Sequence, residues 1–400
     1  MEVQASQIRP SARSRGWSLL LLVTLLGVPA GWAKQKKAPP GKPVQLVWPL
    51  PPEKPRIRFV TAIYGASDIE PTKKANFLDH IAGIQKKDFK PSFVKPYGIA
   101  TDSHNRIFVT DSGQGLVFVL DPDNKKVTYI GVESQVSLRV PLGITVDAQD
   151  RVWVADGFGQ HVYAFDGEGN VLMGLGGPNE MVNPTGVAID GDRHRLYVVD
   201  SKQQCVLVYD SESGHFLSKF GKRGDGRGEF NFPTNLALDK QGRIYVVDTL
   251  NFRVQVFDPD YKFVDTIGQQ GNRFGQFIKP KGIALDSFQN IYVVDSDFDN
   301  FQIFSRQKEL LLFVGAVGQT PGKFWLPAGI CIDRQNRIYV ADQINRRIQI
   351  FKLLDGEPEA PPQESIAKAP APPSTPKGGG AGVAAESKFL KSFNENQKEK

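Results

Sequence analysis

Residues 280–295 read PKGIALDSFQNIYVVD, and variants of this pattern occur six times in the 400-residue chain. Each copy combines a proline, a short apolar run, an Asp-containing turn and a second run of β-branched and aromatic residues that ends in Asp. The prolines that open the copies are Pro96, Pro141, Pro184, Pro233, Pro280 and Pro327. A strand-rich repeat of about 45 residues is typical of a β-propeller or a solenoid.

Two further strands are expected in each copy. After the second apolar run comes a third strand such as 254–257, and after a polar turn comes a fourth such as 263–268, which ends in glycine. The runs are bounded by Asp, Gly and Asn, as β-strands usually are. Four strands joined by short turns form one antiparallel blade. The sequence therefore predicts an all-β fold, a six-bladed β-propeller of four-stranded antiparallel blades.

The two ends of the repeat region are expected to pair. The sixth copy ends at Phe351 without a fourth strand, whereas residues 57–65 have the fourth-strand pattern and precede the first copy. Pairing this N-terminal strand with the last blade leaves no long unpaired edge between the first and last blades. We therefore expect strand 57–65 to close the ring, and its deletion to destabilise the whole propeller.

The regions that flank the repeats have a different composition. Residues 1–33 carry three arginines, an apolar run and a small-residue site ending at Ala33, the order found in secretory signal peptides. The apolar run of about twelve residues is short for a retained membrane anchor, which needs about twenty. Residues 34–55 form a Pro- and Lys-rich lead-in and residues 354–400 a Pro-, Ala- and Gly-rich tail, both expected to be disordered. The mature propeller, residues 56–353, is expected to be periplasmic or secreted, with no transmembrane span after cleavage.

Charge and cysteine content exclude several classes of function. The net charge is +6, and its positive surplus lies in the signal peptide and the lead-in, so the repeats do not indicate a nucleic-acid groove. Cys205 and Cys331 fall in blades about half a turn apart, beyond the reach of a disulfide. No motif for haem attachment is present, so no cofactor is expected.

Repeated polar and small residues have structural explanations. The Asp that ends each second strand occurs six times and is expected to accept backbone N–H bonds at the turn. The glycines Gly98, Gly143, Gly186, Gly282 and Gly329 open the inner strands, where crowded blades leave no room for a side chain. The fourth copy has Asn235 at this position, which is either a polar group at the channel mouth or a tolerated variation.

The repeats resemble NHL repeats. Gly-Ile-Ala-x-Asp, Arg-Ile-Tyr-Val-x-Asp and Arg-Val-Gln-Val-Phe-Asp at 253–258 carry this resemblance, as does the Gly-x-Phe-x-x-Pro approach at 228–233, 275–280 and 322–327. The opening residues 47–58 resemble those of exported bacterial NHL proteins that are often encoded beside multihaem c-type cytochromes. The resemblance implies a partner class, a c-type cytochrome or an envelope protein.

The functional face is expected where the turns between second and third strands meet the connections between blades, because these loops are long and varied. The connection over 66–95 is the longest, and its apolar spacing predicts a short helix near 73–84 that is either a lid or docking element or a structural plug. Arginine and aromatic groups in nearby turns are typical of protein-binding surfaces. For two of the arginines the alternative is a salt bridge between blades. The candidate binding residues are Asn251, Phe252, Arg253, Phe298, Asn300, Asn345, Arg346, Arg347 and Asn235.

An enzyme is not expected, and no catalytic or metal-binding residue is assigned. Only His161 falls on the functional face, and a zinc site needs about three protein ligands. The sequence predicts an exported, non-catalytic scaffold that binds a protein or peptide, with an extracytoplasmic redox or envelope assembly as its setting. The alternatives are a sensor that binds a glycan or small ligand at the channel mouth and a metal-dependent enzyme similar to propeller lyases and lactonases.

Overall fold

The computed structural model describes residues 45–70, 91–132 and 136–354. Every element below belongs to the unit that begins at Val47. The predicted helix near 73–84, the signal peptide and nearly all of the tail lie outside the described residues. In the described part of the long connection, the chain forms one 3₁₀ turn, η1 (Ala66–Asp68).

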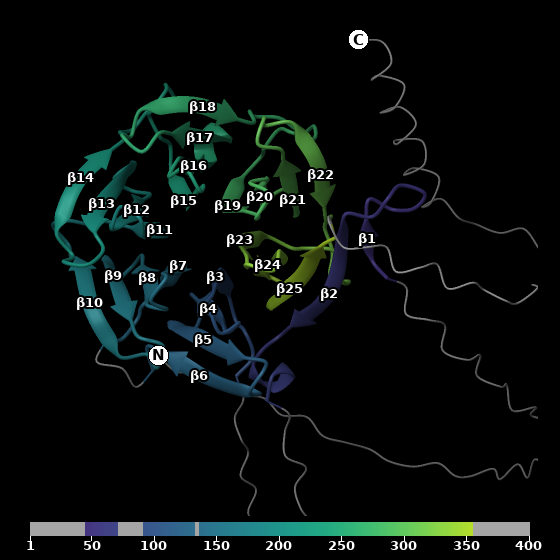
Figure 1. Ribbon diagram of the computed structural model, residues 1–400, viewed down its shortest axis with the longest axis horizontal. Coiled ribbons are helices and arrows are strands. Elements are labelled where there is room, and N and C mark those ends of the chain that lie inside the picture. Colours follow the sequence, from purple (N-terminus) through teal and green to yellow (C-terminus); the bar gives the residue numbers. More distant parts are fainter. Residues whose placement is uncertain (1–44, 71–90, 133–135, 355–400) are drawn as a thin grey trace, which may run out of the picture. The chain divides into compact units, whose positions relative to one another are not determined.

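Six antiparallel sheets follow one another around a central axis (Figure 1). We number the blades I to VI from the first proline-led repeat. Their inner strands are β3 (Pro96–Thr101), β7 (Pro141–Val146), β11 (Pro184–Asp190), β15 (Pro233–Leu238), β19 (Pro280–Leu285) and β23 (Pro327–Ile332). Their second strands are β4 (Ile107–Asp111), β8 (Val152–Asp156), β12 (Arg195–Asp200), β16 (Ile244–Asp248), β20 (Ile291–Asp295) and β24 (Arg337–Asp342).

The third and fourth strands complete each blade toward the outside. The third strands are β5 (Leu116–Asp121), β9 (His161–Phe165), β13 (Cys205–Asp210), β17 (Arg253–Phe257), β21 (Asn300–Phe304) and β25 (Arg347–Leu353). The outer strands are β6 (Lys126–Ile130), β10 (Val171–Gly176), β14 (Phe216–Phe220), β18 (Phe263–Ile267), β22 (Leu310–Val314) and β2 (Ile57–Ile63). The six-bladed architecture predicted from the repeats is therefore confirmed.

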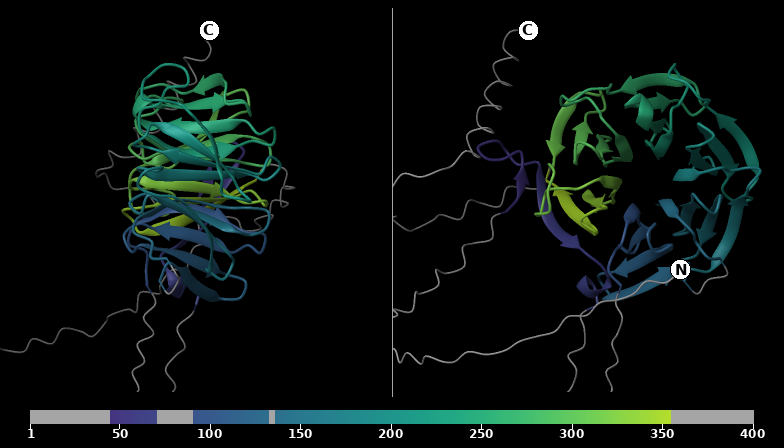
Figure 2. Two further views of the ribbon diagram at one scale, coloured as in Figure 1. Left: turned by 90° about the vertical axis from the view of Figure 1, so that its left-hand side faces the viewer. Right: turned by 180° about the vertical axis from the view of Figure 1, so that it is seen from behind.

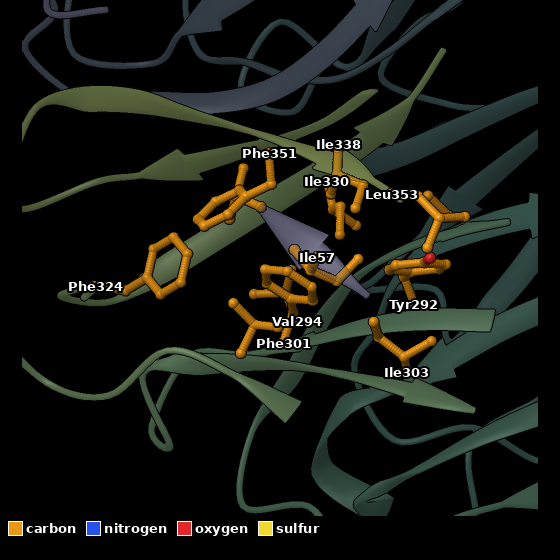
Figure 3. Packing of buried hydrophobic residues seen from close by; sticks show 13 residues of the cluster. Ile57, Tyr292, Val294, Phe301, Ile303, Phe324, Ile330, Ile338, Phe351 and Leu353 are labelled. Carbon is orange, nitrogen blue, oxygen red and sulfur yellow. The ribbon is translucent and has the colours of Figure 1, made fainter. Parts of the chain in front are cut away.

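The closing strand lies where the sequence predicts it. β2 pairs antiparallel with β25, and its register shifts by one residue between Phe59 and Thr61. Ile57 is fully buried in the core between blades V and VI, among Phe301, Phe351 and Leu353 (Figure 3). Because β2 supplies both the outer strand of blade VI and part of this core, the beginning of the described chain is joined to its end.

The lead-in is partly ordered, contrary to the prediction of a disordered segment over 34–55. Val47–Trp48 form β1, which pairs with β2 and makes blade VI five-stranded. The Trp48 ring packs edge-on against Phe351, with ring centroids 5.6 Å apart. Burying part of a large aromatic surface offsets the entropy of ordering this short segment.

Loops project from both faces of the ring, as the side view shows (Figure 2). We call the face with the turns between second and third strands and the connections between blades the upper face. The lower face carries the turns between first and second strands and between third and fourth strands. Within the described residues, no helix has the length and apolar character needed to cross a bilayer.

The glycines of the inner strands are required by close approach between blades. A Cβ on Gly98 would lie 2.3 Å from the carbonyl oxygen of Leu142, and one on Gly329 would lie 2.2 Å from that of Tyr97. Such distances leave no room for any side chain. The expected crowding of blades around the axis is confirmed.

The two cysteines are free, as predicted, with Cys205 in β13 and Cys331 in β23. Burial raises the pKa of the Cys205 thiol to about 11 and that of the Cys331 thiol to about 12. Both thiols are therefore protonated near neutral pH, the form that is neither a good nucleophile nor a metal ligand.

Candidate functional site

The repeated Asp at the end of each second strand builds the upper face. Its carboxylate accepts a hydrogen bond from the backbone N–H two residues before the proline of the same blade, at 2.6–2.8 Å in all six blades. In blade VI the donor is Trp325 and the acceptor is Asp342. The predicted turn role of these aspartates is confirmed, and it fixes each connection against the neighbouring turn.

A second backbone bond reinforces this junction. In blade VI the N–H of Ile344, two residues after the Asp, donates to the carbonyl of Trp325 at 3.2 Å, and Leu250 bonds Asn231 in the same way in blade IV at 3.0 Å. With its polar groups paired, the backbone leaves the side chains at these two positions free to project outward. The upper face thus presents a repeated pair of variable positions on a rigid base.

Many of these outward positions are apolar. Trp325 is 43% exposed and Ile344 is 46% exposed, and the hydrogen bond between their backbones places them side by side. The other exposed large apolar residues at these positions are Val94, Phe158, Val182, Leu250 and Ile278, with Phe232 one position nearer its proline. Exposed apolar side chains gathered on one face mark a surface that can bind another molecule.

Two cavities lie within the propeller. One of about 470 Å³ runs along the axis and is lined by inner-strand residues, among them Gly98, Asn235 and Gly329, and by turns of the lower face. The other, about 420 Å³, is on the upper face between blades IV and V, bordered by Phe252, Gln270 and Ile278. Phe252 thus adjoins the exposed apolar positions. It directly follows the 3₁₀ turn η2 (Thr249–Asn251) and has a φ of 57°.

Two of the predicted arginines, Arg253 and Arg347, hold loops in place and are not free to bind a partner. Arg347 is 1% exposed, pairs with Asp342 at 2.8 Å and donates to the carbonyls of Gln319, Thr320 and Lys323. Its predicted role in binding is therefore wrong. The predicted salt bridge exists, but it lies within blade VI and not between blades.

Arg253 repeats this arrangement in blade IV. Its guanidinium pairs with Asp248 at 2.9 Å and donates to the carbonyls of Gly226 and Glu229 in the connection leading into the same blade. The salt bridge again lies within one blade, contrary to the interblade alternative. Each arginine attaches the connection that leads into its blade to the sheet of that blade. The repeat pattern alone could not show whether an arginine at this position is exposed or buried.

The predicted asparagines also have structural roles. Asn251 donates to the carbonyl of Gly224 at 2.9 Å, and Asn345 donates to that of Gly318 at 2.8 Å. Asn300 is buried, and its Oδ1 has no hydrogen-bond partner among the described residues. Asn235 lines the axial cavity and accepts a bond from the N–H of Leu236 at 2.9 Å.

Arg346 and Phe298 remain available at the upper face. Arg346 is exposed in the turn of blade VI, two residues after Ile344, and Phe298 is half-buried in the corresponding turn of blade V. The sequence reasoning missed Trp325, Ile344 and their counterparts. Aligning the repeats would have revealed these residues. Apolar residues recur two positions before the proline or two after the Asp, where burial does not require them.

The anchoring carboxylates lie in a low-dielectric environment. Burial raises the pKa of Asp248, Asp295 and Asp342, against hydrogen bonds that act in the opposite direction. The bonds that oppose this effect come from backbone N–H groups and, for Asp248 and Asp342, from neighbouring Asn and Arg side chains. These groups are arranged to fix loops, and none lies beside a histidine or nucleophile in an acid–base pair.

The lower face uses its polar groups to join blades. Ser103 of blade I donates to Asp150 of blade II, Ser287 of blade V donates to Asn336 of blade VI, and Arg337 of blade VI donates to Asn105 of blade I. The remaining neighbours are joined by Arg151–Glu212, Arg193–Gln241 and Lys240–Gln289. Every pair of adjacent blades is therefore linked there.

One group of side chains within residues 45–70, 91–132 and 136–354 has the composition of a metal site. Asp102, His104 and Asp150 bring their possible ligand atoms within 4.8 Å of one another on the lower face. Asp102 accepts a bond from Arg106 at 2.5 Å, and Asp150 accepts one from Ser103 at 2.5 Å. Asp150 takes part in the link between blades I and II described above, and Asp102 pairs with Arg106 within blade I. His161, the histidine expected on the functional face, contacts the carbonyl of Gly159 at 2.6 Å and stacks on Tyr163.

Comparisons with known families agree with this architecture. A family described as a 6-bladed beta-propeller matches residues 125–220 and 192–243, and the NHL repeat matches residues 230–257 and 324–351, in blades IV and VI. The chain therefore contains NHL repeats within a six-bladed β-propeller.

Similar proteins match only in part. NHL repeat-containing protein 3 of Homo sapiens is 31% identical over 114 residues, which cover 26% of this chain and 33% of that protein. Peptidylglycine alpha-amidating monooxygenase of Rattus norvegicus is 29% identical over 210 residues, 51% of this chain and 18% of that protein. The matches thus span about a third or less of these relatives.

A solved structure shares the fold. The crystal structure of a structural genomics protein of unknown function from Bacteroides thetaiotaomicron superposes with a TM-score of 0.53 at 20% sequence identity. The superposition covers 65% of this chain and 70% of that one. At this identity the likeness shows the shared architecture alone.

Proposed function

We propose that this chain is an exported, non-catalytic NHL propeller that binds a protein or an extended peptide on its upper face, within an extracytoplasmic redox or envelope assembly. The observation that carries the proposal is the exposed apolar residue beside each Asp anchor, above all the pair Trp325 and Ile344 in blade VI. Tryptophan is among the residues most enriched at the energetic centres of protein interfaces. Because hydrogen bonds hold the backbone that carries Trp325, little conformational entropy is lost on binding.

The setting is supported by the sequence. Residues 1–33 have the features of a cleaved signal peptide, which supports a location in the periplasm or outside the cell. The opening residues resemble exported NHL proteins encoded near multihaem cytochromes, so a c-type cytochrome or an envelope protein is the partner class to test first.

The experiment is affinity capture with mature protein from the extracytoplasmic fraction of the source cell. The wild type is compared with Trp325→Ser combined with Arg346→Glu, which alters the exposed face and leaves the buried Arg347 in place. We expect the variant to fold and to lose the captured partner. Equal recovery by both proteins would reject the upper face as the binding surface.

A second candidate function is small-ligand binding in the axial cavity of about 470 Å³, a volume within the range of ligand pockets. A glycan or another small polar molecule would suit its mixed lining of glycine, threonine and asparagine. Thermal unfolding in the presence of a panel of sugars tests this function, because a ligand that binds only the native state raises the Tm.

The non-catalytic part of the proposal has its own test. Metal analysis of the purified protein is expected to find no stoichiometric zinc or calcium. A stoichiometric ion lost on replacing His104 or Asp150 would instead favour a metal-dependent enzyme on the lower face.

A further inference from the structure

A ring of six residues, one after each opening proline, lies at the upper ends of the inner strands. In blades I to VI these residues are Tyr97, Leu142, Thr185, Thr234, Lys281 and Ala328. Each directly precedes the inner-strand position where Gly98, Asn235 and Gly329 line the axial cavity. This ring of side chains therefore stands at the upper end of the cavity.

Hydrogen bonds in blades III and IV show how this ring is arranged. Thr185 bonds Ser201, the residue after the anchoring Asp of the same blade, at 2.7 Å, and Thr234 bonds the corresponding Thr249 at 2.8 Å. Thr249 also donates to the carbonyl of Pro280 in the next blade at 2.8 Å. In blades III and IV the residue after the Asp thus lies beside its own ring residue, and in blade IV it also reaches the proline of the next blade, whereas Ser112 and Ser296 bond the connection of their own blade.

Gln343 occupies this position in blade VI, after Asp342. The repeat register places it between Ala328 and the Pro96–Tyr97 end of β3, and β24 contacts β3 directly. Gln343 is only 6% exposed, yet its Nε2 has no hydrogen-bond partner among the described residues. Ala328 has no hydroxyl that could accept a hydrogen bond from this amide. The equivalent residues of blades III and IV, Thr185 and Thr234, do have one and use it to bond Ser201 and Thr249. A buried amide donor without a partner costs free energy unless a ligand or water receives its bond.

Two further donors of the ring are free. Within the part of the chain that the structure describes, neither the Lys281 ammonium nor the Tyr97 hydroxyl has a hydrogen-bond or ion-pair partner. Burial lowers the pKa of Lys281, and the positive charges of Lys279 and Lys95 lower it further, against the opposing effect of Asp297.

We propose that Lys281, Gln343 and Tyr97 form a carboxylate-binding site at the upper mouth of the channel. The site offers an ammonium, an amide N–H and a hydroxyl, and all three donors belong to consecutive blades V, VI and I. The nearest counter-charge, Asp297, already pairs with Lys279 at 3.7 Å. An anionic group would satisfy the buried Gln343 amide and relieve the repulsion among the lysines.

This proposal rests on the proposed function and names the chemistry of the partner. Trp325 of blade VI and Val94 of blade I are exposed on the same face. A peptide that packs an apolar residue against Trp325 would insert an acidic side chain, or its own C-terminal carboxylate, into the mouth. Both sources supply the same group, and an experiment can separate them.

The test uses the reactivity of Lys281 itself and needs no partner. Trace reductive methylation, followed by mass spectrometry, measures the labelling rate at Lys281 relative to Lys240, a lysine of the lower face that donates to Ser287. Three ligands with one skeleton are compared. N-acetylglutamic acid α-amide carries a side-chain carboxylate, N-acetylglutamine carries a C-terminal carboxylate, and N-acetylglutaminamide carries neither.

We expect one of the two acids to protect Lys281, with no change at Lys240. At a ligand concentration about twice the dissociation constant, mass action lowers the rate about threefold. The neutral amide should give no protection, and Gln343→Leu and Tyr97→Phe should each weaken protection by the acid. The protecting acid identifies the source of the carboxylate.

Two results would overturn the inference: equal effects of the acids and the neutral amide, including no protection by any of them, or full protection in both variants, which would leave only nonspecific attraction to lysine. Loss of partner capture by the Trp325 variant is a separate outcome and concerns the proposed function. The two proposals can therefore fail independently.

Discussion

The upper and lower faces of the propeller are built from the same repeat but use their side chains differently. On the lower face, polar side chains link all six pairs of adjacent blades. On the upper face, the repeated Asp fixes the loops through their backbone, and the side chains beside it project into solvent. The difference teaches that the upper face combines buried anchors with exposed side chains, and we propose that the exposed ones bind the partner, so substitutions at the two kinds of position should separate stability from binding.

The largest expected effect comes from a buried arginine of the upper face. Arg347→Ala should lower the free energy of unfolding by about 3–5 kcal/mol, because it leaves Asp342 buried without its ionic partner. Arg337→Ala, on the lower face of the same blade, removes a pair whose arginine is 32% exposed and should cost about 1 kcal/mol. Urea unfolding of both variants measures the contrast. Equal losses would show that burial does not distinguish the two faces.

A smaller effect is expected from a single link of the lower face. Asn336→Ala removes two bonds to Ser287, at 3.0 and 2.9 Å, and places alanine at a φ of 57°. We expect the free energy of unfolding to fall by about 1–2 kcal/mol, with binding to the upper face unchanged. If the variant bound the partner more weakly under conditions where it is fully folded, the lower face would also take part in recognition.

The smallest effect concerns pH. Because burial and neighbouring lysines lower the pKa of Lys281, the unfolded chain binds this proton more tightly than the native state. The native state is therefore penalised below the lowered pKa, and the penalty disappears as pH rises toward the ordinary lysine value. Lys281→Met should raise the Tm at pH 7, and the gain should shrink as pH approaches 10. Calorimetry at several pH values checks this trend, and a gain that grows with pH would contradict it.

Much of the fold could be predicted because the residues that determine it recur periodically in the sequence. The prolines, inner-strand glycines and terminal aspartates recur at fixed spacing, and residues 57–65 complete the count of strands. β1 was missed because a two-residue strand has no pattern of its own and depends on contact between Trp48 and Phe351.

The candidate site was predicted less well. Arginine at the start of a third strand is compatible with exposure or burial, and only the path of the preceding connection decides between them. That connection surrounds Arg347 with carbonyl groups. Gln343 could not be recognised from sequence, because its lack of a partner depends on Ala328 in a neighbouring strand.

The central claim is tested most directly by two matched aromatic residues on opposite faces, Trp325 (43% exposed) on the upper face and Phe288 (55% exposed) on the lower face. The measurement is the dissociation constant of the captured partner, by calorimetry, for Trp325→Ala and Phe288→Ala. Trp325→Ala should weaken binding at least about tenfold, or about 1.4 kcal/mol, with Phe288→Ala close to wild type. A larger loss with Phe288→Ala, or equal losses, would contradict the assignment of binding to the upper face.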